Sequence, residues 1–230
     1  PSAHPVTGQA LSVSEHLAQR SARSDFKQLL EDFWGERSMG SGKRSALFAA
    51  DLKFLGEMPR LSVNFDHVTS LKLTGNVTTA GLEPFAALFP NLQTLKLKAF
   101  TLYDIPSFVG RLQYLKELKL NDCALTLSPA GQQLLGTLPE LRLLDLSHNP
   151  LSNAPDLTTL PKVTNFLLGH TDLTSVPKGI AEHPLLRELS LANNQITELP
   201  DAIFSLKPDK ADGIYLNDNP LSINARERVK

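Results

Sequence analysis

The sequence predicts an α/β fold, a solenoid in which short parallel strands are stacked side by side and preceded by a helical cap. Two observations predict it. Leucine recurs in a fixed pattern along most of the 230 residues, and an amphipathic stretch precedes the first copy of this pattern. The formal net charge of −1 disfavours a dedicated nucleic-acid-binding protein, which is usually clearly basic.

Composition and chain ends give further expectations. A single cysteine cannot form an intrachain disulfide, which fits a reduced compartment or a fold that needs no covalent crosslink. No apolar run approaches the roughly 18–20 residues that a membrane span needs. The chain runs from Pro1 to Lys230 without a secretory apolar segment, so we expect a piece of a longer protein.

The N-terminal flank is predicted to be a flexible segment at residues 1–23 and a helical cap at residues 24–60. From Ser24, apolar residues recur with helical spacing on one face: Phe26, Leu29, Leu30, Phe33 and Trp34. A second helical stretch, residues 45–55, places Phe48, Leu52 and Leu55 on one side. We expect these helices to cover the open end of the first repeat; a partner-binding amphipathic hairpin is the alternative.

Residues 61–224 contain seven copies of the pattern L-x-x-L-x-L-x-x-N, in which Val, Ile, Phe or Ala replaces some leucines. The copies begin 22 to 26 residues apart, at Val68, Leu92, Leu115, Leu141, Val163, Leu186 and Ala211. This period is typical of leucine-rich repeats. Alternating leucines of each strand point inward, and stacked copies bury a shared core. The sequence therefore predicts a horseshoe with a parallel concave sheet of about seven strands.

The Asn position of the pattern predicts a structural ladder. An inward amide can satisfy backbone N–H and C=O groups that the turn leaves without partners, and Thr or Cys is a smaller substitute. The predicted ladder residues are Asn76, Cys123, Asn149, Thr171, Asn194 and Asn219. Phe100 occupies the position in the second copy and cannot hydrogen-bond, so we expect a local irregularity there.

The connections are predicted to follow the convex side. Ser128 and Pro129 predict the N-cap and first residue of a short helix that ends at Gly136. Another short helix is predicted over residues 81–89. Residues 225–230 are predicted to begin a truncated C-terminal segment, with no cap equivalent to the one at the N-terminal end.

Three stretches carry a family resemblance: Val63–Gly75, Leu144–Leu151 and Gly213–Leu221. They resemble repeats of the IpaH-like bacterial effectors, the novel E3 ligase (NEL) class, including Pseudomonas-type relatives, and the resemblance covers roughly residues 60–224. It implies that the repeats recognise a host protein and restrain a separate C-terminal ubiquitin-ligase domain. It further implies a secreted effector, of the type III kind, that acts in the host cell cytoplasm.

The family's Cys-x-Asp nucleophile is not matched, because Cys123 is followed by Ala124 and Leu125. A buried ladder thiol is normally inert. We therefore expect no catalytic residue and no enzyme activity in this chain, with any ligase domain outside it.

No metal site and no cofactor are expected either. Gly40–Ser45 suggests a phosphate loop, but Arg44 occupies the Ser/Thr position, so a linker is favoured. His148 and His170 occupy the same position in adjacent repeats and should stack roughly 5 Å apart. A paired-histidine metal or pH site remains an alternative to solvated surface residues, because no third ligand is evident.

The outward strand positions predict the binding face. Its residues are Lys72, Lys96, Lys98, Lys119, Leu143, Asp145, Leu167 and Tyr215, basic in the N-terminal half and partly apolar in the later half. This pattern predicts docking of a protein with an acidic patch beside an apolar contact; a solubilising surface is the alternative.

The sequence thus favours a protein-binding module, the substrate-recognition and regulatory part of an effector ubiquitin ligase. We expect a host protein as partner, no nucleic acid, no membrane span, and an intramolecular contact with a downstream catalytic domain. The alternative is a structural or regulatory spacer in a large bacterial toxin, without an external partner.

Overall fold

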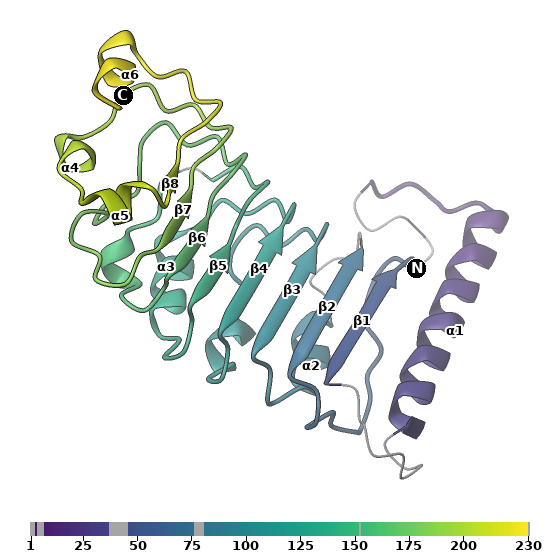
Figure 1. Cartoon of the computed structure of the whole chain (residues 1–230). Coiled ribbons are helices and arrows are strands. Elements are labelled where there is room, and N and C mark those ends of the chain that lie inside the picture. The colour runs from purple at the N-terminus through teal and green to yellow at the C-terminus, as the bar shows by residue number, and fades with distance from the viewer. Residues whose placement is uncertain (1–2, 4–6, 37–45, 76–80, 152, 230) are drawn as a thin grey trace.

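The computed structural model describes residues 3, 7–36, 46–75, 81–151 and 153–229. Its strands form one parallel sheet in chain order. They are β1 (Leu47–Leu52), β2 (Ser70–Gly75), β3 (Thr94–Lys98), β4 (Glu117–Asn121), β5 (Leu143–Asp145), β6 (Asn165–Leu167), β7 (Glu188–Ser190) and β8 (Ile214–Tyr215). Figure 1 shows them side by side between α1 (Val13–Glu36) and α6 (Ile223–Val229). The predicted leucine-rich-repeat solenoid is confirmed.

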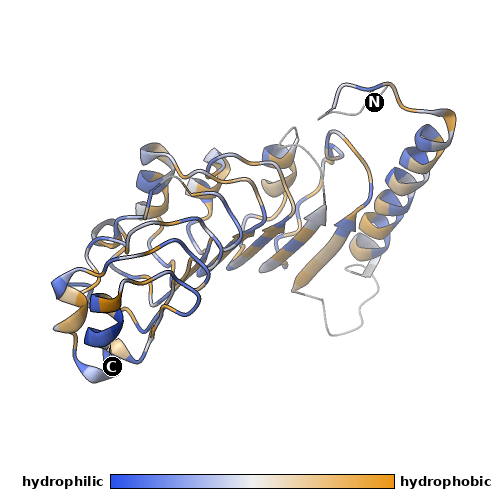
Figure 2. Cartoon of the chain, turned by 90° about the horizontal axis from the view of Figure 1, so that it is seen from above, coloured by the Kyte–Doolittle hydropathy of each residue, from blue (hydrophilic) through white to orange (hydrophobic). Residues whose placement is uncertain are grey.

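The segments that connect the strands carry short helices. In the view of Figure 2, these connections lie on one side of the sheet, apart from the strands. The helices are α2 (Leu82–Ala86), the 3₁₀ helices η1 (Ser107–Arg111) and η2 (Leu157–Thr159), α3 (Pro129–Gly136), α4 (Asp201–Phe204) and α5 (Pro208–Ala211). The predicted helices after Gly81 and Ser128 are both present, although α2 ends at Ala86. The Ser128 hydroxyl accepts a hydrogen bond from the Gly131 N–H at 3.0 Å, as an N-cap should.

The prediction of a second cap helix at residues 45–55 is wrong, because residues 47–52 form the strand β1. Phe48 and Leu52 are buried, and the residues between them alternate as in a strand. Two apolar residues four positions apart fit both a helix and a strand, so their spacing could not decide. The exposed edge of β2 decided it, since its backbone groups gain hydrogen-bond partners when β1 pairs with them.

The helix α1 is longer than predicted and begins at Val13, within the segment expected to be flexible. Ser12 and Glu15 form a capping box: the Ser12 N–H donates to the Glu15 carboxylate at 2.7 Å, and the Glu15 N–H donates to the Ser12 hydroxyl at 3.3 Å. The S-x-x-E spacing was present in the sequence and is the signal that was missed. The predicted apolar face is also narrower, because Leu29 is 41% exposed while Phe26 and Leu30 are buried.

An aromatic cluster joins α1 to the first repeats. The ring centroids of Phe26 and Phe54 are 5.3 Å apart. Those of Phe33 and Phe48 are 5.0 Å apart, as are those of Phe65 and Phe89. Arg23 adds a hydrogen bond to the Glu57 carbonyl at 3.2 Å. α1 therefore covers the N-terminal end of the core.

At the C-terminal end, where the sequence predicts the start of a truncated segment, the short helix α6 packs on the last repeat and leaves Ile214 and Leu216 partly exposed. Ala225 is buried, and the Ser222 N–H donates to the Thr197 carbonyl at 2.8 Å. Arg228 forms an ion pair with Asp201 at 2.9 Å, and its guanidinium carbon lies 3.7 Å from the centroid of the Phe204 ring. Within the described residues, no helix is long and apolar enough to cross a membrane.

Candidate functional site

The sheet surface is built by strict register between repeats. Lys72 pairs with Lys96, and Lys96 pairs with Lys119, so three lysines stand in one row across β2, β3 and β4. Neighbouring strands lie about 4.8 Å apart. Lys98 stands in the next row, opposite Thr74.

These four lysines form what we call the basic island. Lys72 and Lys98 are exposed, and Lys96 and Lys119 are half-buried. Among the described residues, one ion pair involves the island: the Lys119 ammonium lies 3.2 Å from the Glu117 carboxylate. Both side chains are substantially exposed, so this ion pair contributes little to stability, and the island keeps a positive excess.

The newly found strand β1 changes the extent of the basic surface. Ala49 continues the lysine row beyond Lys72, and Asp51 pairs with Thr74. On the other side, Asp145 pairs with Lys119. The basic surface is therefore an island bounded by acidic residues on two sides, whereas the sequence predicted that it would occupy the whole N-terminal half.

The apolar part of the predicted face is only partly brought together. Leu143 on β5 and Leu167 on β6 are half-buried and lie on adjacent strands, two positions apart in register. Tyr215, 48% exposed, is separated from Leu167 by Ser190 of β7. Asn165 donates to the Glu188 carboxylate at 2.6 Å, which adds a polar pair that the sequence did not predict.

Beneath the face, the ladder side chains hold neighbouring repeats together. The Asn149 Oδ1 accepts from the N–H groups of Cys123 at 2.8 Å and Leu125 at 3.0 Å, while its Nδ2 donates to the carbonyls of Leu120 and Leu146. The same arrangement recurs two repeats later, at Asn194.

In that later step the Asn194 Oδ1 accepts from the N–H groups of Thr171 and Leu173, both at 3.0 Å. Asn219 accepts from the Ile196 N–H at 3.0 Å. The Thr171 hydroxyl donates to the Leu168 carbonyl at 2.8 Å. Each amide therefore serves backbone groups of its own repeat and of the repeat before it.

Cys123 and Phe100 occupy ladder positions with side chains that carry no amide or hydroxyl group. The Cys123 thiol is fully buried, 3.3 Å from the Asn121 carbonyl oxygen. Burial raises the pKa of the Cys123 thiol to about 11, against the opposing effect of the Phe100 backbone N–H. Phe100 is buried, and the sheet register continues across its repeat, so the expected irregularity is not found in the strand pairing. Asn76 lies outside the described residues.

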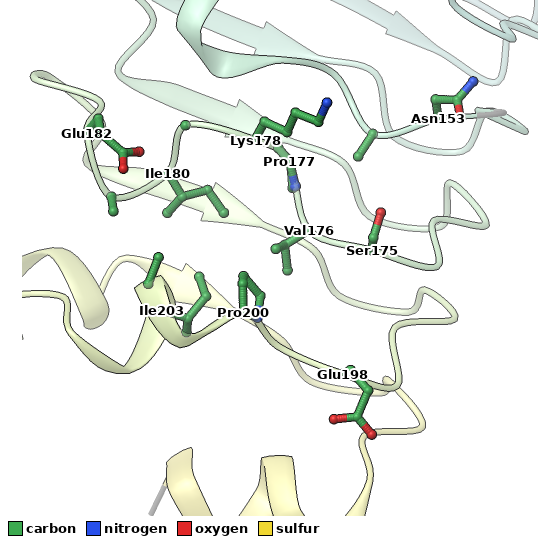
Figure 3. A pocket seen from close by; sticks show the side chains of 14 residues that line it. Asn153, Ser175, Val176, Pro177, Lys178, Ile180, Glu182, Glu198, Pro200 and Ile203 are labelled. Carbon is green, nitrogen blue, oxygen red and sulfur yellow. The ribbon is translucent and has the colours of Figure 1, made fainter.

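A groove lies on the side of the connections, between the segments 175–182 and 198–203, with a volume of about 710 Å³. Figure 3 shows Val176 and Ile180 facing Pro200 and Ile203 across it, with Glu198 at its margin. The lining is mainly apolar, and its residues follow those of the basic island in the sequence. Among the described residues, no group of three or more His, Cys, Asp or Glu side chains is placed to hold a metal ion. The phosphate-loop stretch, residues 40–45, lies outside the described part.

Comparison with known proteins agrees with this architecture. The family model described as Leucine Rich Repeat matches residues 140–160 and 185–206. The rat leucine-rich repeat-containing G-protein coupled receptor 5 is 32% identical over 130 residues, which are 56% of this chain and 14% of the receptor. Chaoptin of Drosophila melanogaster is 32% identical over 132 residues, which are 56% of this chain and 9% of chaoptin. The chain spans less than a quarter of the length of either relative.

Solved structures give the same fold. A leucine-rich-repeat protein of Leptospira interrogans has a TM-score of 0.56 at 24% identity, covering 72% of this chain and 41% of that one. An internalin-like protein of Listeria monocytogenes has a TM-score of 0.54 at 23% identity, covering 76% of this chain and 50% of that one. Together with the repeats and the family model, these structures show a leucine-rich-repeat fold.

Proposed function

We propose that this leucine-rich-repeat domain binds a protein partner through the basic island, with Leu143 and Leu167 as an adjoining apolar contact. The observation that carries the proposal is the register that aligns Lys72, Lys96 and Lys119 on three neighbouring strands. Like charges at this spacing repel mildly, and an acidic segment of a partner would relieve that repulsion. The parallel sheet fixes the spacing of the three lysine backbones before a partner binds, which lowers the entropic cost of binding.

The test is a charge reversal at the island. The triple variant Lys72→Glu, Lys96→Glu, Lys119→Glu is compared with Lys27→Glu, Lys162→Glu, Lys207→Glu, which makes the same charge change outside the sheet. Both variants and the parent chain are used as bait in host-cell lysate at increasing NaCl. We expect that the parent chain and the second variant capture a protein that the island variant does not capture. Increasing NaCl should release this protein from the parent chain. Equal capture by both variants would rule the island out.

The resemblance to IpaH-like effectors supports a finer proposal: the captured protein is the substrate of a ubiquitin ligase, and the domain acts in the host cytoplasm. The support is the similarity of Leu144–Leu151 and Gly213–Leu221 to the repeats of that class. Ubiquitin transfer to the captured protein by the full-length parent protein, with E1 and E2 enzymes, is the measurement. Binding without transfer would leave the binding module standing and refute the ligase assignment.

A further inference from the structure

Two histidine rings lie face to face where neighbouring strands end. His148 follows β5 and His170 follows β6, and their ring centroids are 4.5 Å apart with planes at 13°. Both residues are exposed, so solvent and dissolved ions can reach the ring nitrogens. Neutral imidazole is the commonest protein ligand for transition metals.

The repeat backbone fixes both residues in equivalent positions. His148 has φ 61° and His170 has φ 55°, both in the left-handed region. The His148 N–H donates to the Gly169 carbonyl at 2.9 Å, and the His170 N–H donates to the Ala192 carbonyl at 3.1 Å. The backbone of both residues is therefore fixed, and only the side-chain torsions have to be ordered when the pair binds an ion.

From this geometry we propose that His148 and His170 chelate one divalent transition-metal ion, Zn²⁺ or Cu²⁺, between adjacent repeats. Zinc–nitrogen bonds of about 2.0–2.1 Å require two tetrahedral nitrogen ligands about 3.3 Å apart. Exposed rings with centroids 4.5 Å apart reach this spacing by tilting toward each other about χ2, whose rotational preference is broad.

The surroundings favour a cation and leave the ion open on one side. Asp122 occupies the same repeat position one step before His148 and adds a negative charge. With two protein ligands, the remaining coordination positions are filled by water or by a donor atom from a bound partner. The same strands carry Leu143 and Leu167, so an ion here would stand at the margin of the apolar contact. The site does not depend on the proposed binding through the basic island.

The test uses the whole chain after treatment with a chelator. Titration with ZnCl₂ or CuCl₂ in a calorimeter is expected to show one ion per chain, with the tighter binding for Cu²⁺. His148→Asn and His170→Asn are each expected to raise the Kd at least tenfold. Asparagine removes the imidazole but tolerates the left-handed backbone, as Asn193 does at the same position of the next repeat.

The matched control is His16→Asn, which removes an exposed histidine of α1 and should leave the Kd unchanged. A second readout is thermal unfolding: Zn²⁺ should raise the Tm of the parent chain but not that of the double variant, because a ligand that binds only the folded state stabilises it. Retention of the site in the double variant would overturn the proposal. So would a loss caused by only one of the two substitutions, since a single histidine would then hold the ion.

Discussion

The residue before each ladder position has a positive φ in six successive repeats. These residues are Ala99, Asp122, His148, His170, Asn193 and Asp218. Asn, Asp and His tolerate this left-handed conformation better than other non-glycine residues. The sequence therefore already suits the backbone at five of these positions, and Ala99 is the exception.

Replacing Ala99 with glycine should stabilise the fold. Glycine removes the steric cost of φ 59°, which exceeds the entropy that glycine adds to the unfolded chain, so we expect a gain of about 0.5–1 kcal/mol. Urea unfolding measures it. The control Ala49→Gly lies in the extended strand β1, and its free energy of unfolding should fall by about 0.5–1 kcal/mol. If both substitutions changed the free energy of unfolding in the same direction, the left-handed backbone at Ala99 would not explain the result.

Cys123 gives a second prediction at this scale. Its unfolded pKa is 9.0 and its folded pKa is about 11, so the folded state keeps the proton longer as pH rises. The stabilisation is therefore complete below pH 9 and is lost between pH 9 and 11, by roughly 2–3 kcal/mol. The unfolding free energy of the parent chain should fall across this interval relative to that of Cys123→Ala. Parallel curves for the two proteins would show that the thiol does not contribute.

At the scale of single elements, α3 shows how one repeat holds the helix of the next. The Asp104 carboxylate accepts hydrogen bonds from the Ser128 N–H at 3.1 Å and from the Ser128 hydroxyl. That hydroxyl in turn caps α3 at the Gly131 N–H. A Cβ at Gly131 would overlap the Asp104 carboxylate. Glycine is required here by a neighbouring repeat, although it is a poor helix former.

Gly131→Ala should therefore destabilise the domain, despite the gain of about 1 kcal/mol that Ala brings within a helix. Overlap with this half-buried cap should cost about 1–3 kcal/mol, which exceeds this gain. The urea unfolding midpoint of Gly131→Ala is measured beside that of the control Gly35→Ala in α1. A Cβ at Gly35 meets no atom within 4 Å, so the control should be stabilised. In an Asp104→Ala background the penalty of Gly131→Ala should disappear. If it persists there, the carboxylate is not its cause.

At the scale of the whole molecule, α1 closes the N-terminal end of the core, whereas α6 covers the last repeat only in part. α1 covers the first repeats through the aromatic cluster around Phe26, Phe48 and Phe54. α6 packs on the last repeat through Ala225, but Ile214 and Leu216 stay partly exposed. A stack of identical repeats always has two such ends, and both need a cover with a polar outer face.

Phe26→Ala should cost about 3–5 kcal/mol, because it removes a buried ring that contacts three other rings. Leu29→Ala is the matched control: the sequence places both residues on one helical face, but Leu29 is 41% exposed and should change stability by about 0.5 kcal/mol or less. Calorimetric unfolding of both variants measures the difference. Similar losses in the two variants would mean that α1 packs through a wider face.

The sequence by itself determined the parts of this protein that depend on local repetition. The leucine period predicted the parallel solenoid, and the pairs Ser128–Pro129 and His148–His170 predicted a cap and a ring contact that the structure contains. These features depend on residues that repeat at fixed spacing, and stacking brings equal positions together. The basic row of Lys72, Lys96 and Lys119 follows from the same rule.

Only the tertiary structure decided the features that depend on what lies beside a segment. Phe48 and Leu52 fit a helix or a strand equally well, and the unpaired edge of β2 made them a strand. That strand then placed Asp51 beside the lysine rows, so the candidate binding surface became a bounded island. The physical reason is that a backbone edge and an open core end need partners, and the local sequence does not specify which segment provides them.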